Sequence, residues 1–599
     1  MPFLPICKED LKERNWDSAD VIVVSSDAYV DHPSFGHAVV SRLLESLGLK
    51  VAVLAQPNWR DDLRDFKKLG KPNLFFAISS GMDSMVNHYT AGKRLRSTDA
   101  FTPGGKSGFR PDYAVYVYSR ILKSLYPDIP VVIGGLESSL RRITHYDYWQ
   151  DKLKPSILAE TQADLLIYGM GEKPLKELVR LLKKGVPFSN LTSISQTGFI
   201  VAKDKVPKNK KWEDLYLDSH EACTSDKKIY FKNFKLFENE TNKMFGKRIL
   251  QDIEDKTLVL NPAFPPLKYG ELDESFEYPY MRAPHPRYKK RGSVPAFEMI
   301  KFSINSHRGC FGGCSFCAIN AHQGKFIASR SRESILREVE VITQMEDFKG
   351  TITDLGGPSA NMYKMGGKDK SRCEKCARPS CLFPKICDNL NTFHKDLLAL
   401  YDEIKKHKKV KHLFIGSGVR YDLLLQETDN EELKKDHEIY TKALIENHVS
   451  GRLKVAPEHT SDTVLRLMRK PSFSLFYKFK KIFDTNCKKA NKNQQIIPYF
   501  ISSHPGCTEK DMALLAVETK NLGFHLEQVQ DFTPTPLTLS TEMYYAELSP
   551  KNEPLYVAKT PEQKKSQQRF FFWYNKENRS WIKETLKRLK LENLIKRLL

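Results

Sequence analysis

The sequence contains no long apolar run, and this absence argues against a protein that spans a membrane. No part of its 599 residues approaches the roughly 18 consecutive apolar residues that a spanning helix needs. The chain also begins without a basic segment followed by an apolar run, the pattern typical of a signal peptide. We therefore expect a cytoplasmic protein.

Neither charge content nor hydrophobicity departs from the values of ordinary soluble proteins. Charged residues make up 28% of the chain and hydrophobic residues 40%. At 599 residues the chain exceeds the ~250–300 residues at which single cores stop growing, so we expect several domains. The formal net charge of +22 permits a nucleic-acid partner, but a generally lysine-rich proteome explains the same excess.

Cysteines are few outside one region, which argues against a disulfide framework. Seven of the eleven lie between Cys310 and Cys387, and in a cytosolic chain such clustering favours metal ligation. Cys310, Cys314 and Cys317 have C-x3-C-x2-C spacing in a loop with three glycines, which lets the backbone turn three thiolates toward one point. Three thiolates are one short of a closed zinc site or a four-cysteine iron–sulfur cluster. The spacing therefore predicts a metal site with one open position.

The same loop resembles the signature of the radical S-adenosylmethionine (SAM) enzymes. The resemblance rests on the cysteine spacing and on Phe316, the aromatic residue just before the last cysteine. It implies a [4Fe–4S] cluster whose free iron binds SAM, and reductive cleavage of SAM to a 5′-deoxyadenosyl radical that abstracts hydrogen. A zinc loop, or a set of structural cysteines, is the alternative that spacing alone leaves open.

The N-terminal third alternates between apolar strands and helical segments. Five runs of the kind buried in a parallel sheet occur at residues 21–25, 51–54, 74–78, 131–135 and 165–168. Residues 37–47 have apolar side chains at helical spacing. This alternation predicts an α/β fold with a doubly wound parallel sheet over residues 1–202 and any ligand at the carboxyl ends of the strands.

This region also resembles, in part, the cobalamin-binding domain that precedes the radical domain in many radical SAM enzymes. The matching text is IGG at residues 133–135 and GMGE at residues 169–172. Domains that ligate cobalt through histidine carry D-x-H-x-x-G, whereas residues 31–36 read DHPSFG and give His32 the wrong offset. We therefore expect no cobalamin. Residues 203–298, which mix lysine-rich and proline-rich text, are expected to form a connecting arm over the active-site opening.

Residues 299–530 have the pattern of six strand–helix units. Their strands are expected at residues 302–305, 412–418, 453–459, 495–501 and 526–530, and residues 350–358 are expected to form the second strand and its loop. Six such units form a partial (β/α)6 TIM barrel of the radical SAM type, with the site on the loops at the carboxyl ends of the strands.

Those loops carry the candidate SAM-binding residues. Arg420 can offer a planar fork to a carboxylate, and Glu458 can accept hydrogen bonds from ribose hydroxyls. By resemblance, Gly356 and Gly357 occupy the place of the glycine motif that approaches the amino group of SAM. Ile501 begins a loop similar to the fifth-strand loop that contacts adenine.

Four more cysteines lie between the second strand and its helix. Cys373, Cys376, Cys381 and Cys387 have C-x2-C-x4-C-x5-C spacing, which fits either a tetrahedral zinc or a second iron–sulfur cluster. Spacing does not decide between the two. One further thiol, Cys507, follows the fifth strand and is a candidate hydrogen donor, although a buried structural thiol is more common.

Longer stretches resemble the YgiQ family of radical SAM proteins over nearly the whole chain. They include TDLGGPSANMY (353–363), SGVRYDL (417–423), LKVAPEHTSDTVLRLMRKP (453–471) and SSHPGCTEKDM (502–512). The resemblance implies a radical SAM enzyme reduced by a protein such as flavodoxin or ferredoxin, and it implies no particular substrate. Two alternatives stay open: a radical SAM methyltransferase or RNA-modifying enzyme, and a non-catalytic metal-binding scaffold.

Residues 531–599 are expected to form a small basic C-terminal domain. A lysine-rich amphipathic helix is predicted from Trp581 to Leu598, with leucines at i, i+3 and i+4 spacing. Packing on the barrel is its simplest role, and binding to an anionic polymer or membrane surface is the alternative.

Overall fold

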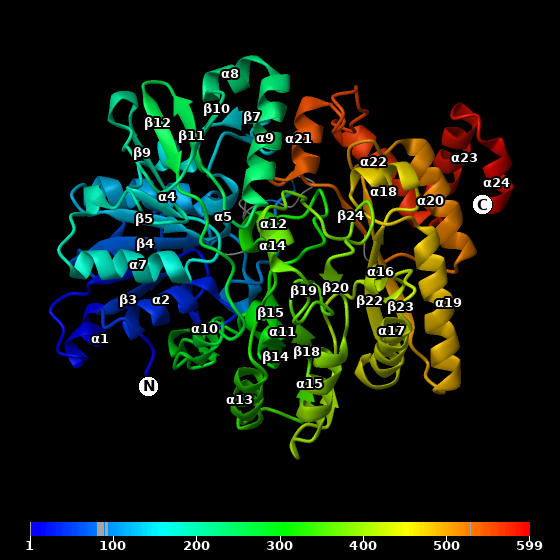
Figure 1. Ribbon diagram of the computed structural model, residues 1–599, viewed down its shortest axis with the longest axis horizontal. Coiled ribbons are helices and arrows are strands. Elements are labelled where there is room, and N and C mark those ends of the chain that lie inside the picture. Colours follow the sequence, from blue (N-terminus) through cyan, green and yellow to red (C-terminus); the bar gives the residue numbers. More distant parts are fainter. Residues whose placement is uncertain (1, 81–88, 90–93, 528) are drawn as a thin grey trace.

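Two α/β units make up most of the molecule. The computed structural model describes residues 2–80, 89, 94–527 and 529–599. One unit is built on strands β1 to β12 and the other on strands β14 to β24, and the two lie side by side (Figure 1). Among the described residues, no helix is both long and apolar enough to cross a bilayer.

The N-terminal unit contains the large parallel sheet that the sequence predicts. Its five parallel strands run in the order β3-β1-β4-β5-β8. Their bounds are β1 Val21–Ser25, β3 Val51–Ala55, β4 Phe75–Ser80, β5 Val131–Gly134 and β8 Leu165–Ile167. The chain changes direction across the sheet between β1 and β4, and ligands of open α/β sheets bind at the carboxyl ends of such strands.

Both faces of this sheet are covered, because successive side chains of each strand point to opposite sides. Val21 and Val23 of β1 pack in one apolar core, whereas Ile22 and Val24 pack in another. The first core includes side chains of α2 (Gly36–Ser46) and α7 (Glu172–Lys183), and the second those of α4 (Ala114–Leu125). Burial on both faces explains why the strands read as continuous apolar runs.

The same sheet continues beyond β8 into the segment expected to be a connecting arm. The added strands are β9 Thr197–Ala202, β12 Lys256–Leu260, β11 Arg248–Ile253 and β10 Asp214–Leu217. Antiparallel pairing joins β8 to β9, β9 to β12 and β12 to β11, and β10 pairs parallel with β11. Residues 203–298 therefore contribute three strands to a nine-stranded sheet.

The rest of that segment packs against the loop after β1. Strand β13 (Ala283–Pro284) pairs with β2 (Val30–Asp31), and the His285 ring stacks on Tyr29 with centroids 5.6 Å apart. The Tyr29 amide donates a 2.9 Å hydrogen bond to the Tyr288 hydroxyl. His285 thus has a packing role.

The second unit contains parallel strands separated by helices, in the predicted order. The strands are β14 Ser303–Asn305, β17 Thr351–Ile352, β18 Asp354–Gly356, β21 His412–Leu413, β22 Arg452–Glu458, β23 Gln495–Ser502 and β24 Val529–Asp531. The helices between them include α13 Arg332–Thr343, α15 Lys395–Lys405, α17 Glu431–Ala443, α19 Ser474–Lys489 and α20 Glu509–Asn521.

Parallel hydrogen bonding joins these strands in three sets. One set pairs β14 with β18, the second pairs β17 with β21, and the third contains β22, β23 and β24. Within the described ranges, β21 and β22 are not paired. A continuous six-strand barrel therefore stays a prediction.

Two of the predicted strands differ in extent. The third was expected over residues 412–418 and ends at Leu413, because the amides of Gly416 and Ser417 donate to the Asp354 carboxylate, at 2.8 and 3.1 Å, instead of to a neighbouring strand. The sixth strand was expected to begin at Leu526, but it begins at Val529. Residue Gln528 of the predicted strand lies outside the described residues.

The C-terminal helix predicted from Trp581 to Leu598 is interrupted. It is divided into α23 (Arg579–Arg588) and α24 (Ile595–Leu598), with Lys590 between them in a left-handed conformation at φ 56°. Its buried side chains join the core of the second unit: Ile582, Leu586, Leu594 and Leu598. The apolar face of this segment is therefore used for packing.

A buried carboxyl group lies where the C-terminal domain meets the N-terminal unit. Glu542 of α21 (Leu539–Ala546) is fully buried beside Tyr230 of α9 (Lys227–Thr241). Burial raises the pKa of this carboxyl to about 8, the Tyr230 hydroxyl lowers it, and the Glu238 charge raises it. The folded protein therefore binds this proton more tightly than the unfolded chain does. Stability falls as the pH rises from the usual carboxyl range through about 8.

We predict that Glu542→Gln, which cannot ionise, reduces the loss of stability at alkaline pH by up to a few kcal/mol. Urea unfolding at about pH 5 and about pH 9 measures the effect, because linkage acts between the two pKa values. The control is Glu584→Gln at an exposed position of α23, which should follow the wild type. Equal pH dependence of Glu542→Gln and the wild type would contradict the prediction.

Candidate active site at the cysteine loop

The cysteine loop lies between β15 (His307–Arg308) and α12 (Ile319–Gln323). Other segments hold its main chain through individual hydrogen bonds. The Cys381 amide and the Ser380 hydroxyl donate to the carbonyls of Phe311 and Gly312, at 2.9 and 2.6 Å. The Ser540 amide donates to the Ser315 carbonyl at 2.9 Å. The position of the loop therefore depends on the cysteine-rich insert on one side and on α21 on the other.

The α21 contact continues through side chains. The hydroxyls of Ser315 and Ser540 are 2.8 Å apart, and His504 Nε2 lies 2.7 Å from the Ser540 hydroxyl. His504 is fully buried, and burial lowers its pKa to about 3, so the ring is neutral at ordinary pH. These three residues join the cysteine loop, the loop after β23 and the C-terminal domain.

The three predicted cluster thiols share polar neighbours. Arg420 Nη1 lies 3.5 Å from the Cys314 sulfur, and the Ser359 hydroxyl lies 3.6 Å from the Cys310 sulfur. Burial and, to a smaller extent, the nearby Cys314 raise the pKa of the Cys317 thiol to about 12. In the part of the chain that the structure describes, no three cysteine sulfurs lie within 4.8 Å of one another, whereas a tetrahedral zinc–thiolate site needs about 3.8 Å.

Gly356 and Gly357 lie at the end of β18, beside the first strand. A Cβ added at Gly357 would lie 2.6 Å from Nε2 of His307, a ring that is 1% exposed. His307 Nδ1 is 2.9 Å from the Ser306 hydroxyl, and Nε2 makes no hydrogen bond to any residue that the structure describes. Burial lowers the pKa of His307 to about 4. Close approach of this neutral ring is thus a structural reason for glycine at position 357.

Arg420 does reach the cysteine loop, but most of its planar fork is already used. Nε and Nη2 donate to the two carboxylate oxygens of Asp422, at 2.9 and 2.5 Å. Burial opposes ionisation of Asp422, and the adjacent Arg420 charge lowers its pKa below the usual range. Only Nη1 faces the thiols. In this structure the planar fork of Arg420 therefore binds the Asp422 carboxylate, and its Nη1 lies against the Cys314 sulfur.

Glu458 ends β22 in an unusual backbone conformation. Its φ of 68° is in the left-handed region that non-glycine residues rarely adopt outside constrained sites. Lys470 Nζ lies 3.5 Å from its carboxylate. Burial raises the pKa of Glu458, while the Lys470 and Arg420 charges lower it. The charge of Glu458 also acts on Cys317, which locates this carboxyl near the cysteine loop.

The remaining predicted residues have mainly packing neighbours. Ile501 of β23 is buried in the core of the second unit, and the half-buried Phe316 packs against the same core. The Phe316 ring lies edge-on to His504 with centroids 6.3 Å apart. Cys507 is fully buried, and its sulfur faces His459 Nε2 at 3.4 Å.

The four cysteines of the insert lie next to the cysteine loop. Cys373 is on α14 (Lys370–Glu374), between the short strands β19 (Gly366–Gly367) and β20 (Leu390–Asn391). Phe311 shares a small apolar cluster with Leu382 and Leu390, and Cys310, Cys381 and Cys387 pack against it. The structure thus brings both cysteine sets to one region.

A cavity of about 610 Å³ opens between the two units. On one side it is lined by the carboxyl ends of β4, β5 and β8, including Ser79, Ser80 and Gly135. On the other side it reaches Asp354 and Gly357. Its wall is mostly apolar: Phe35, Val39, Val40, Leu43, Leu136 and Leu175. The switch point of the first sheet therefore faces the loops of the second unit.

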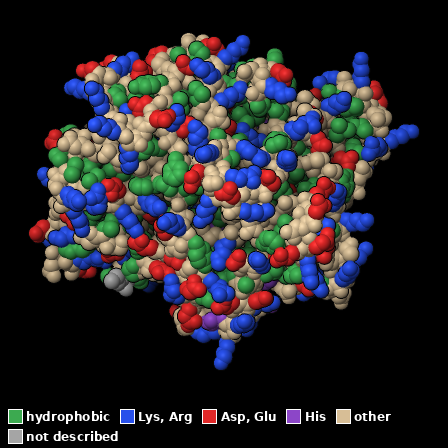
Figure 2. Space-filling model, viewed as in Figure 1, with side chains coloured by type: hydrophobic (Ala, Val, Ile, Leu, Met, Phe, Trp, Pro, Cys, Tyr) green, Lys and Arg blue, Asp and Glu red, His purple; other side chains and the backbone are tan. Residues whose placement is uncertain are grey.

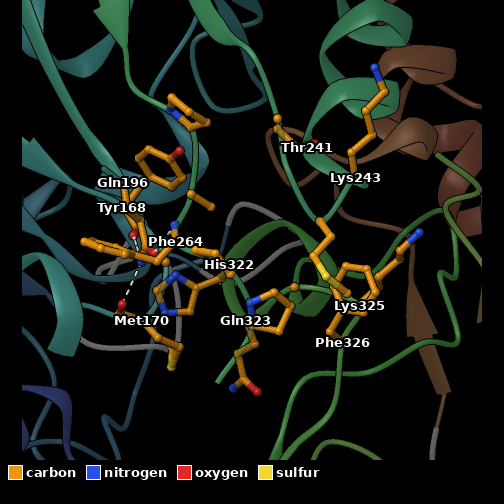
Figure 3. Close-up of a pocket in the computed structure, with 18 of the residues that line it drawn as sticks. Tyr168, Met170, Gln196, Thr241, Lys243, Phe264, His322, Gln323, Lys325 and Phe326 are labelled. Carbon is orange, nitrogen blue, oxygen red and sulfur yellow. Dashed lines mark hydrogen bonds between the residues drawn. The ribbon is translucent and has the colours of Figure 1, made fainter. Parts of the chain in front are cut away.

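A smaller cavity of about 180 Å³ adjoins this one, and Figure 3 shows its lining. His322 lies among Met170, Tyr168 and Phe264 there, and lines both cavities. The Gln196 amide donates to the carbonyls of Tyr168 and Met170, at 2.7 and 2.6 Å. Burial, together with the charges of Arg142 and Arg308, lowers the pKa of His322 to about 4. Its neutral ring is therefore a candidate substrate contact.

His32 does not line the large cavity. Its Nδ1 accepts a hydrogen bond from the Ser34 amide at 3.1 Å, and burial lowers its pKa. This geometry fits a structural role for His32 in the loop after β1.

One group of side chains outside the site has the spacing of metal ligands. His394, Asp436 and His437 bring three ligand atoms within 4.8 Å of one another. The Asn361 amide accepts from the Arg420 N–H at 2.8 Å, so its nitrogen faces His394 Nε2 at 3.2 Å and makes that ring nitrogen an acceptor. Asp436 accepts from the His394 backbone amide at 2.6 Å, and His394 Nδ1, 3.4 Å from the same carboxylate, makes no hydrogen bond to another described residue.

Several residues around the site carry no sequence signal. Asp422 lies two residues beyond Arg420, a spacing that any loop can have, and Lys470 follows Glu458 by a helix and a turn. Ser540 and Ser315 are 225 positions apart. Only the fold brings these groups together.

Comparison with known proteins gives a consistent family. A profile described as Radical SAM N-terminal matches residues 3–303, and one described as a domain of unknown function, DUF3362, matches residues 527–597. A UPF0313 protein of Porphyromonas gingivalis is 57% identical over 598 residues, covering 100% of this chain and 94% of that protein. UPF0313 proteins of Bacteroides thetaiotaomicron and Methanocella arvoryzae are 56% and 45% identical, over 100% and 97% of this chain and 98% and 94% of theirs.

Solved structures with a related outline are more distant. The radical SAM methyltransferase TsrM of Kitasatospora setae, solved with cobalamin and a [4Fe–4S] cluster, is 12% identical with a TM-score of 0.47, covering 87% of this chain and 73% of that chain. The cobalamin-dependent SAM radical enzyme OxsB is 12% identical with a TM-score of 0.47, covering 90% and 56%.

We predict that Gly357→Ala disturbs the site and that Gly418→Ala does not. A methyl group at position 357 would collide with the buried His307 ring, whereas nothing lies within 4 Å of one at position 418. Gly357→Ala should lower iron content after reconstitution and lower the free energy of unfolding by roughly 1–3 kcal/mol. The double variant Gly357→Ala/His307→Ala removes the clash and should recover part of the iron content. Wild-type behaviour of Gly357→Ala would contradict the expected clash.

Proposed function

The chain belongs to the UPF0313 family of radical SAM proteins, and from this we propose that Cys310, Cys314 and Cys317 hold the [4Fe–4S] cluster of a radical SAM reaction. The resemblance drawn from the sequence is confirmed at the level of the family, and the chain is a radical SAM enzyme. Which residues hold the cluster and SAM, and what the substrate is, belong to the proposal.

The donor set supports this assignment. The loop supplies three thiols, one fewer than the four cysteines of a closed zinc site or of a fully ligated cluster. A [4Fe–4S] cluster bound there supplies the electron that cleaves SAM to methionine and a 5′-deoxyadenosyl radical. The protein's part is to fix the thiols, exclude water and hold SAM and substrate in reacting positions.

Four elements of the second unit offer contacts for SAM. Nη1 of Arg420 provides positive charge beside the thiols, and the buried Glu458 carboxylate is a hydrogen-bond acceptor for ribose hydroxyls. The backbone of Gly356 and Gly357 gives close approach at the second strand, and the backbone at Ile501 gives the fifth-strand contact. We place these residues on the loops of a partial barrel formed by the six predicted strand–helix units.

The single observation that carries the substrate proposal is the cavity of about 610 Å³ between the two units. It extends from Gly357 to the carboxyl ends of β4 and β5, so a molecule bound there would lie next to the proposed SAM site. A volume in this range holds a small molecule, and its apolar wall with a few polar groups favours a substrate with an apolar body. On the face shown in Figure 2, Lys and Arg are scattered among acidic residues, so no basic stripe there favours a nucleic-acid substrate.

We further propose that this cavity receives the substrate and not cobalamin. The histidine of residues 31–36 does not line it, and the close packing of Gly135, where an added Cβ would lie 3.0 Å from the Ser80 carbonyl, explains that glycine without a cofactor. The electron comes from a reducing protein of the flavodoxin or ferredoxin type in the cytoplasm. Cobalt in protein produced with cobalamin would instead favour the methyltransferase alternative.

We predict that anaerobically reconstituted, reduced protein converts SAM to 5′-deoxyadenosine, measured by mass spectrometry. Replacing Cys310, Cys314 and Cys317 together by alanine should abolish this product and reduce iron content, because the variant lacks the proposed cluster ligands. Cys487→Ala, a buried cysteine far from the loop in sequence, is the matched control. Unchanged product from the triple variant would overturn the assignment of the cluster.

We predict that a bulky side chain in the cavity prevents the substrate from binding but leaves SAM cleavage without substrate unchanged. Val40 of α2 lines the cavity, so Val40→Trp should block binding of a small molecule and leave the cysteine loop intact. Addition of a small-molecule cell extract should raise 5′-deoxyadenosine formation in the wild type but not in Val40→Trp, with basal formation similar. Val341→Trp, at a half-exposed position of α13, should behave as the wild type. Equal stimulation of Val40→Trp would place the substrate elsewhere.

A further inference from the structure

A second group of cysteines is built around a buried lysine next to the cysteine loop. The Cys376 amide donates to the Cys373 carbonyl at 3.2 Å, and the Cys387 amide donates to the Cys381 carbonyl at 2.8 Å. The Cys381 thiol lies within electrostatic reach of the other three. Turns of the main chain therefore bring all four thiols into one neighbourhood.

The spread of these thiols favours one of the two metals that their spacing allows. No three of the seven sulfurs between Cys310 and Cys387, all within the described residues, lie within 4.8 Å of one another. Zinc holds its four thiolates at about 3.8 Å from one another, because each Zn–S bond is about 2.3 Å long. An iron–sulfur cluster spreads its four cysteines over two or four irons, so that no three of them bind the same metal atom. The insert shares this wider spread with the cysteine loop.

Lys325 supplies a charge that such a cluster needs. It is 4% exposed, and its ammonium donates to the carbonyls of Cys376 and Arg378, at 3.0 and 2.9 Å. Within the described ranges it pairs with no carboxylate, whereas the thiols of Cys376, Cys381 and Cys373 act on its charge. A buried ammonium without a negative partner is costly, and thiolates at these positions would compensate it.

Ligand sulfurs of iron–sulfur clusters accept hydrogen bonds from nearby amides, and these bonds tune the potential. The Asn389 side-chain amide lies 3.4 Å from the Cys373 sulfur and donates to the Asp369 carbonyl at 2.8 Å. At Gly367 an added Cβ would collide with the same sulfur. The Gly367 backbone on one side and the Asn389 amide on the other therefore fix the position of the Cys373 thiol.

We infer that Cys373, Cys376, Cys381 and Cys387 hold a second iron–sulfur cluster, with Lys325 as its buried counter-charge. Hydrogen bonds join the insert directly to the cysteine loop. The Cys381 amide donates to the Phe311 carbonyl, and the Ser380 hydroxyl donates to the Gly312 carbonyl. Both cysteine sets also contact one apolar cluster. The second cluster thus lies beside the first and helps to hold its loop.

The test uses the full chain in three forms: the wild type, the alanine variant of Cys310, Cys314 and Cys317, and a serine variant of the four insert cysteines. Each is reconstituted anaerobically with iron and sulfide, and iron, sulfide and zinc are measured per chain. The alanine variant should retain about two to four irons with equal sulfide and a cluster signal by Mössbauer spectroscopy, although it cannot cleave SAM. Wild-type protein should contain about twice the iron of the alanine variant if both clusters have four irons.

Zinc in place of iron at the insert, or an alanine variant without iron and sulfide, would overturn the inference. Iron and sulfide at the insert are measured in the alanine variant, which lacks the ligands of the first cluster. The outcome therefore does not depend on SAM cleavage, so failure of the proposed function and failure of this inference are distinguishable. The serine variant should retain the first cluster's iron; if it fails to fold, the alanine variant alone still decides.

Lys325 gives an independent readout in the alanine variant. Lys325→Met removes the positive charge and should make the reduction potential of the remaining cluster more negative, whereas Lys325→Arg should preserve it. Redox titration followed by electron paramagnetic resonance measures both. An unchanged potential in Lys325→Met would contradict the role of Lys325 as counter-charge.

Discussion

The hydrogen bonds on the carbonyls of the cysteine loop are the interactions on which the site depends. A segment with glycine at positions 309, 312 and 313 has little conformational preference of its own, so its shape has to come from its surroundings. Phe311 and Gly312 are held by the insert, and Ser315 is held by α21. Because these partners come from segments far away in the sequence, the three thiols reach their positions only when the second unit and the C-terminal domain are folded together.

Buried charges around the loop are compensated mainly within the protein, and this constrains what remains for a ligand. Arg420 is paired with Asp422, and Glu458 with Lys470, so each group enters the site with part of its hydrogen-bonding capacity already used. An unpaired arginine or glutamate in the same place would carry a large desolvation cost before any ligand bound. The internal pairs lower that cost and fix the rotamers, which leaves Nη1 of Arg420 aimed at the thiols.

Secondary structure was predicted best from the sequence where the local residue pattern matches the burial of the element in the fold. The residues of β1 are apolar and β-branched because the strand is covered on both faces, and the predicted bounds of 21–25 are confirmed. Prediction failed where one distant group competes with the local pattern. The Asp354 carboxylate takes the amides of Gly416 and Ser417 and shortens the third strand, and the left-handed Lys590 interrupts the last helix. The same holds for the site: Cys310 and Arg420 could be named from motifs, but Asp422, Ser540 and His307 could not be assigned a place without the fold.

The arrangement of the two units explains why the site needs the N-terminal sheet. A primary radical reacts with whatever lies within contact distance, so the volume next to it has to be filled by substrate and closed to other molecules. Here the carboxyl ends of β4, β5 and β8 face the loops of the second unit across one cavity. Arg308, just before the cysteine loop, forms an ion pair with Glu172 at the start of α7 and ties the two walls together. Although burial opposes ionisation of Glu172, the Arg308 charge lowers its pKa below the usual range, so this tie persists through neutral pH. In the proposed function, the N-terminal sheet thus forms the second wall of the cavity beside the cysteine loop, and its side chains contribute most of the apolar lining that a substrate would meet.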